Sequence, residues 1–159
     1  MDMRHSIVAI LLGGLIAGTI DIGAACLISM LGPVFILHVV ASGLIGHDAA
    51  FNGGLQTAAL GMLLQWGMSL IIAAIFVIAS SILPVLRRNW VTFGLLYGVG
   101  IYVVMNWVVL PLSALHAWPH PSLKSVALNG LAMLLFGLIV SYFAQRPRGS
   151  SAVPAAAAA

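Results

Sequence analysis

Five polar side chains stand within otherwise apolar stretches of the sequence, and they are the residues best able to do chemistry. They are Asp21, Gln65, Tyr102, Asn106 and Asn129. A carboxyl group in apolar surroundings can hold or pass a proton, and neighbouring amide and phenol groups can orient a polar ligand. The same groups can instead hydrogen-bond across helices and hold them together. Both interpretations require the elements that carry these five groups to bring them to one depth.

The apolar stretches identify the class of protein. Of the 159 residues, 62% are hydrophobic and 6% are charged, whereas a soluble domain carries about 25% charged residues. A soluble monomer and a largely disordered chain are therefore both excluded. A membrane helix needs about 20 apolar residues, and four stretches qualify, namely 7–30, 58–83, 92–115 and 125–144. We predict an all-α membrane protein with one four-helix transmembrane domain over 1–145 and a disordered, low-complexity tail over 146–159.

The basic residues predict how the helices are oriented. Five of the six lie before the first stretch, between the second and third, or after the fourth: Arg4, Arg87, Arg88, Arg146 and Arg148. Because basic residues are enriched in cytoplasmic segments, both termini are expected in the cytoplasm. Lys124 is the exception, since it falls on the outer side. Charges so placed indicate topology, and no nucleic-acid partner is expected.

The first outer connection, over 31–57, is unusually apolar. Its segment 33–45 is too short to cross a bilayer, so we predict an interfacial or re-entrant helix there. Pro33 suits the first turn of such a helix, and Gly46 suits its end. Asp48 is expected to cap a further short turn that runs through Phe51.

Four of the five histidines fall in the two outer connections, namely His38, His47, His116 and His120. The last two are four residues apart, which on a helix places both rings on one face. Pro119 between them disfavours a regular helix. We therefore favour rings that anchor the loops at the headgroups, and a metal or haem site is the weaker alternative.

Counting residues along each stretch predicts the depth of the polar groups. At about 1.5 Å per residue, Asp21 and Asn106 both lie about 4 Å outward of the middle of their helices. Gln65 and Asn129 lie about 8 Å outward on the same count. Since all of them fall in the outer half, Asp21 is expected to pair with Asn106 or Tyr102, or to face a water-filled cleft.

Small residues and one proline predict how the helices pack. Two glycine pairs have the spacing that allows another helix to approach closely: Gly14 with Gly18, and Gly94 with Gly98. The second pair fits internal packing and a dimer face equally well. Pro111 has no backbone amide, so we predict a kink near it and a carbonyl freed on Trp107.

Two parts of the sequence resemble small bacterial inner-membrane proteins of the YagU-like family. They are residues 41–46 with 49–54 (ASGLIG and AAFNGG), and residues 97–99, 105–106 and 109–114 (YGV, MN and VLPLSA). In overall pattern the resemblance covers most of 7–145, although Trp66 stands near a position where relatives carry a histidine. The resemblance implies a four-helix inner-membrane fold and supplies no reaction, ligand or catalytic residue.

No combination of residues typical of an enzyme is present, so neither catalysis nor a cofactor is expected. The first hypothesis is a structural or interaction protein of the lipid bilayer, self-associating through its glycine faces or binding a membrane-protein partner. The second is a proton-linked transporter or sensor with a polar pocket open to the periplasm. That pocket would be centred on Asp21 and Asn106, with segment 33–45 as its lid. Metal or haem binding by the outer histidines is the third.

Overall fold

The computed structural model describes residues 3–114 and 123–145, and all regular elements in these ranges are helical. In chain order they are α1 (Met3–Ser29), α2 (Pro33–Ile45), α3 (His47–Asn52), α4 (Gly54–Ile82), α5 (Pro84–Arg88), α6 (Trp90–Val104), the π-helical turn η1 (Met105–Val109), α7 (Leu110–Leu112) and α8 (Leu123–Ala144). Four helices are long and apolar enough to cross a membrane, the third being α6 continued through η1 and α7. The predicted fold class is confirmed, including the short apolar helix between the first two spans.

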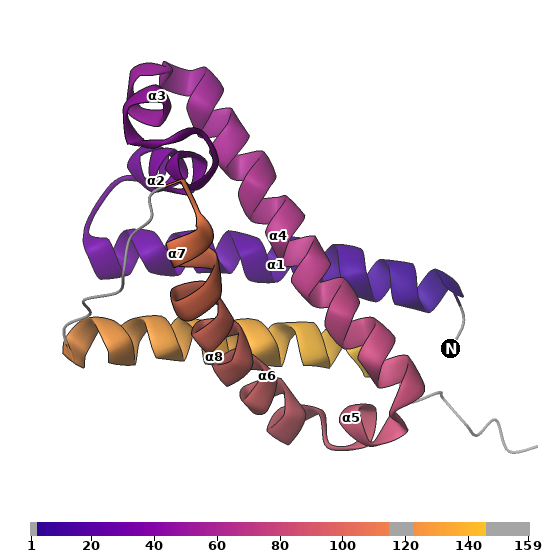
Figure 1. Ribbon diagram of the computed structural model, residues 1–159. Helices are drawn as coiled ribbons and strands as arrows, with labels where there is room; N and C mark the ends of the chain where they lie inside the picture. Colours follow the sequence, from indigo (N-terminus) through magenta and orange to yellow (C-terminus); the bar gives the residue numbers. More distant parts are fainter. Residues whose placement is uncertain (1–2, 115–122, 146–159) are drawn as a thin grey trace, which may run out of the picture.

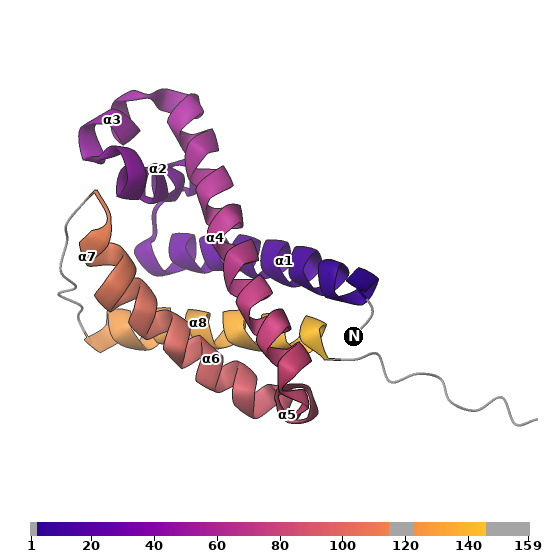
Figure 2. The same ribbon diagram turned by 45° about the vertical axis from the view of Figure 1, so that its right-hand side comes forward.

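The other long helices pack around α8, which contacts α1 on one side and α6 on the other (Figure 1). Helix α4 crosses α1 and carries α2 and α3 beside its first turns. Helices α4 and α6 are joined through α5 and spread apart toward α2 and α7 (Figure 2). Near α5 they meet at Tyr97, whose hydroxyl donates to the carbonyl of Ile72 over 2.7 Å and whose ring packs on Phe76.

The two ends of the bundle differ in composition. The start of α1, the α5 turn and the end of α8 lie at one end, which therefore carries Arg4, Arg87 and Arg88 (Figures 1 and 2). Trp90 and Tyr142 pack edge to face at this end, with ring centroids 5.6 Å apart. Helices α2 and α3 and the start of α8 lie at the opposite end. Below, the α5 end is called the inner end and the α2 end the outer end.

The first glycine pair lets α1 and α4 approach closely. A Cβ atom on Gly14 would lie 3.1 Å from the Cα of Leu70, and one on Gly18 would lie 2.9 Å from the Cβ of Ser69. These contacts are within one chain. Within the described residues this glycine pair is therefore packed against α4, and self-association of the protein stays a prediction.

The second glycine pair holds α6 against α8. A Cβ atom on Gly98 would lie 2.8 Å from the Cα of Leu134, and one on Gly94 would lie 3.1 Å from the carbonyl oxygen of Gly137. Of the two roles that the sequence left open, the structure selects internal packing. Both glycine pairs thus build the bundle itself.

Helix α2 has the predicted bounds, with Pro33 in its first turn and Gly46 at its end. Gly46 has a φ of 82°, a conformation that glycine adopts readily, and it also stands directly before α3. Asp48 is not the cap of α3, as was expected, because Gly46 occupies that position. The Asp48 side chain instead lies in the first turn, with Oδ1 3.4 Å from Nδ1 of His47.

The helix register changes where the kink was predicted. Pro111 cannot donate to Trp107, and the amide of Leu110 bonds to the carbonyl of Met105, five residues back. The resulting π-helical turn, η1, continues α6 into α7 without a break in the helical backbone. Turns of this kind often occur at functional sites.

Candidate functional site

Asp21 and Gln65 form a hydrogen-bonded pair where α1 and α4 cross. The Nε2 amide of Gln65 donates to Oδ2 of Asp21 over 2.9 Å. Gln65 is buried, with 8% of its surface exposed, and Asp21 is half-buried. Among the residues that the structure describes, these are the two members of the predicted polar group that bond to each other.

A second polar contact flanks the same crossing. The indole N–H of Trp66 donates to Oγ1 of Thr19 over 3.3 Å, and the Thr19 hydroxyl donates to the carbonyl of Leu15. Gly18 directly precedes Thr19 on α1, and a Cβ atom on it would lie 2.9 Å from the Cβ of Ser69, so the helices pack closely beside these hydrogen bonds. Because Trp66 has this structural partner, its indole helps to fix α4 on α1.

Asn106 does not bond to Asp21, which corrects the pairing expected from their equal depth. Its Nδ2 donates instead to the carbonyl of Tyr102 over 2.9 Å, within the same helix. That carbonyl also accepts the backbone amide of Met105 at the start of η1. Asn106 therefore supports the π-helical turn.

Asn129 is placed elsewhere again, near the start of α8. Its Nδ2 donates to both the carbonyl and the hydroxyl of Ser125, over 2.9 and 3.0 Å. The five predicted residues are thus distributed over three locations, with one interhelical pair among them.

The main cavity of the site is a groove between α4 and α6, which we call the α4–α6 groove. Its inner part has a volume of about 450 Å³ and is lined by apolar side chains on both helices, with Gly100 among them. Its outer part, of about 380 Å³, extends to Gln65 and lies under α2. The two parts adjoin one another, since Met68, Met105 and Val109 line both.

Helix α2 covers the outer part of the groove. It approaches α4 so closely that a Cβ atom on Gly61 would overlap the carbonyl of Leu37. The amide of Ala114, after α7, donates to the carbonyl of Gly43 over 2.8 Å. This hydrogen bond connects the end of α7 to α2. The segment predicted as a lid therefore lies over a groove, although the groove is mostly apolar.

Several groove residues were not predicted from the sequence. Met68 and Met105 line both parts of the groove, and Gly100 leaves open space on α6, with no neighbour within 4 Å of a Cβ placed on it. Unbranched, polarizable methionines are common on surfaces that bind varied apolar ligands. This is a weak signal, because methionine fills helix cores equally well.

Two of the outer histidines, His38 and His47, pack against the ring of Phe51. His38 donates from Nε2 to the carbonyl of Gly54 over 2.9 Å, and its ring lies 5.4 Å from that of Phe51. His47 stacks on Phe51, with a centroid distance of 4.6 Å. Within 3–114 and 123–145, no three His, Cys, Asp or Glu side chains gather in a way that could hold a metal. His116 and His120 lie outside these ranges.

Comparison of the chain with protein-family models, with curated proteins and with solved structures finds no match.

Proposed function

We propose that the protein is a membrane-embedded binding protein that accepts a single-chain amphiphile in the α4–α6 groove. The observation that carries this proposal is that the two parts of the groove adjoin. Together their lining residues extend from Gly100 to Gln65. A fatty-acyl chain would occupy the inner part, and the polar end of the molecule would reach Gln65.

The size of the groove favours a chain over a partner helix. Along α4 the groove extends from Ile75 to Leu64, eleven positions apart, or about 16 Å. A helix is about 10–12 Å across with its side chains, so this length of helix occupies on the order of 1,200 Å³. The two parts, at about 450 and 380 Å³, together amount to about two-thirds of that volume. A narrow, flexible alkyl chain suits such a space better.

Gln65 offers the polar contact at the outer end. A side-chain amide has two donor hydrogens and one acceptor oxygen, and one hydrogen is directed at Asp21. The remaining donor and the acceptor match a hydroxyl or carboxyl group on the ligand. Asp21 holds the amide in place from α1, so its role in binding is to position Gln65.

A photoreactive fatty acid tests the proposal. The probe carries a diazirine at mid-chain and is added to membranes that contain the full-length protein, and labelled peptides are then sequenced. We expect labels on the groove residues Met68 and Met105. Labels spread equally over lipid-facing residues such as Leu63 and Ile78, which are 65% and 57% exposed, would contradict a specific groove.

The proposal places the protein in a bacterial inner membrane with both termini cytoplasmic and assigns it no catalytic step. The outer end of the groove then opens toward the periplasm. Proton-linked transport is the extension of this proposal in which Asp21 titrates. In that case Asp21→Asn abolishes proton-coupled movement of the amphiphile while leaving equilibrium binding intact.

A structural or interaction role is the second candidate, and the Asp21–Gln65 bond supports it. This bond joins two spans inside one chain, as interhelical polar contacts in membranes commonly do. Chemical cross-linking in native membranes separates the candidates. Recovery of a stable complex that persists when the groove is blocked would favour the interaction role over amphiphile binding.

A further inference from the structure

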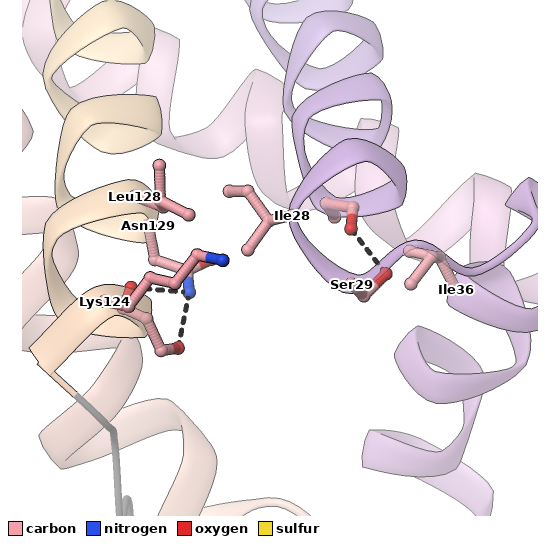
Figure 3. Close-up of a pocket in the computed structure, with 8 residues that line it drawn as sticks. Ile28, Ser29, Ile36, Lys124, Leu128 and Asn129 are labelled. Carbon is pink, nitrogen blue, oxygen red and sulfur yellow. Dashed lines mark hydrogen bonds between the residues drawn. The ribbon is translucent and has the colours of Figure 1, made fainter.

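A second cavity lies at the outer end of the bundle, on the side of α1 and α8 (Figure 3). Its volume is about 370 Å³, and it is formed by the last turns of α1, the first turns of α8 and α2. It shares no lining residue with the α4–α6 groove. Apolar and polar side chains both face it, among them Ile28, Ile36, Leu128, Ser29, Lys124 and Asn129.

Lys124 gives this crevice a positive charge. It is the one basic residue that falls at the outer end by the predicted topology. Its side chain extends from α8 toward α1 across the mouth of the crevice (Figure 3). Within the described ranges its ammonium has no carboxylate partner, since the ion pair found there joins His47 and Asp48. The crevice therefore favours an anionic group next to Lys124.

The other polar groups of the crevice act mainly as acceptors. Both hydrogens of the Asn129 amide are used on Ser125, so its Oδ1 is left to accept. The Ser29 hydroxyl donates to the carbonyl of Ala25 over 2.6 Å, and its oxygen already accepts the amide of Leu31 over 3.3 Å. A ligand that fits this set carries an anion for Lys124 and a hydrogen-bond donor beside it.

The position of the crevice determines which molecules of this kind it meets. Helix α1 has 27 residues, or about 40 Å, whereas the hydrocarbon core is about 30 Å thick. A helix of this length places both of its ends near the headgroup layers, and Ser29 and Lys124 lie at the corresponding ends of α1 and α8. Ile28, Ile36 and Leu128 form apolar walls that continue toward the hydrocarbon.

We infer that this crevice binds the phosphate headgroup of a phospholipid from the outer leaflet. Lys124 contacts the phosphate, and Asn129 accepts a hydrogen bond from a headgroup hydroxyl or ammonium. The glycerol and the first part of the acyl chains lie against Ile28 and Leu128. Phosphatidylglycerol and phosphatidylethanolamine meet these requirements, whereas phosphatidylcholine has the phosphate but no hydrogen-bond donor.

Native mass spectrometry of the full-length, delipidated protein in detergent tests this site. Titrations use phosphatidylglycerol, phosphatidylethanolamine, phosphatidylcholine, glycerol phosphate and inorganic phosphate. We expect the first two lipids to bind several-fold more tightly than phosphatidylcholine, and far more tightly than either soluble phosphate. Lys124→Gln should weaken phosphatidylglycerol binding about fivefold, which corresponds to the loss of one cation near a lipid phosphate. Lys124→Arg should retain it.

Arg88→Gln is the matched control, because it removes one exposed basic residue from the inner end. An equal loss in Arg88→Gln and Lys124→Gln would overturn the site, since general charge would then explain binding. Unchanged phosphatidylglycerol binding in Lys124→Gln would also overturn the site. Soluble glycerol phosphate that binds as tightly as the lipid would overturn the lipid assignment. Gln65→Leu should leave this binding unchanged, so the crevice and the α4–α6 groove can fail separately.

Discussion

The amide nitrogen of Gln65 lies 2.9 Å from a carboxyl oxygen of Asp21 and joins α4 to α1 inside the membrane-spanning body. One turn away, Gly18 allows the two backbones to approach closely. Polar bonding and close packing therefore act at the same crossing. The outer end of the α4–α6 groove is built on this crossing, because Gln65 belongs to both.

Loss of the Asp21 carboxyl should weaken the crossing. Asp21→Ala leaves the Gln65 amide without its partner, and we expect the free energy of unfolding to fall by about 0.6–1.7 kcal/mol. Asp21→Asn keeps an acceptor oxygen, so its free energy of unfolding should fall by less. The measurement is unfolding by SDS in mixed micelles. Thr19→Ala is the control, because its bond to Trp66 is longer, at 3.3 Å, and exposed. Unchanged stability in Asp21→Ala would show that the bond contributes nothing.

Alanine at Gly98 should separate α6 from α8. The added Cβ would lie 2.8 Å from the Cα of Leu134, so backbone atoms must move, and overpacking of this kind costs about 1–3 kcal/mol. Gly100→Ala is the matched control two residues away, because its Cβ meets no atom within 4 Å. We expect a lowered thermal unfolding temperature for Gly98→Ala alone. Equal shifts in the two variants would mean that helix propensity, and not contact, determines the outcome.

Replacement of Pro111 should change the groove more than it changes stability. Pro111→Ala supplies the amide that the Trp107 carbonyl lacks. The gain from that hydrogen bond and the loss of proline's rigidity are each about 1 kcal/mol or less and oppose one another. With the α-helical register restored, Met105 and Val109 rotate away from their present positions in the groove wall. We expect several-fold weaker amphiphile binding and a slowly exchanging amide at position 111. Rapid exchange there together with normal binding would contradict this account of η1.

The orientation can be tested with two matched cysteine variants in a Cys26→Ala background. Asn52→Cys lies at the end of α3 and Asn89→Cys follows α5, and both positions are exposed. Since basic residues gather at the α5 end, we expect an impermeant maleimide to label position 52 in intact cells and position 89 only after permeabilisation. The reverse pattern would invert the topology and make the α4–α6 groove open toward the cytoplasm.

The spans were predictable because apolar length alone identifies them, and α2 followed from Pro33, Gly46 and the apolar residues between them. The start of α1 at Met3, four residues before the predicted start, has a simple cause. Backbone hydrogen bonding continues through Arg4 and beyond the apolar stretch, so the helix is longer than its apolar part.

The partner of Asp21 was not predictable from depth. Counting residues along each stretch assumes parallel helices, whereas α4 crosses α1 at an angle and brings Gln65 to Asp21. Which helices are neighbours also depends on packing: α8 holds both α1 and α6, and Asn106 turns to its own backbone. The groove has no sequence signal of its own. It forms because α6 packs along α8 and diverges from α4.

Blocking the groove at Gly100 tests the central claim most directly. Gly100 and Gly67 both have open space around a Cβ position, but only Gly100 lines the α4–α6 groove. The measurement is the Kd of a fluorescent fatty acid for purified full-length protein in detergent, in wild type, Gly100→Phe and Gly67→Phe. We predict at least about a tenfold loss of affinity for Gly100→Phe, the equivalent of about 1.4 kcal/mol, with wild-type affinity for Gly67→Phe. Equal affinity in all three proteins would contradict amphiphile binding in the groove.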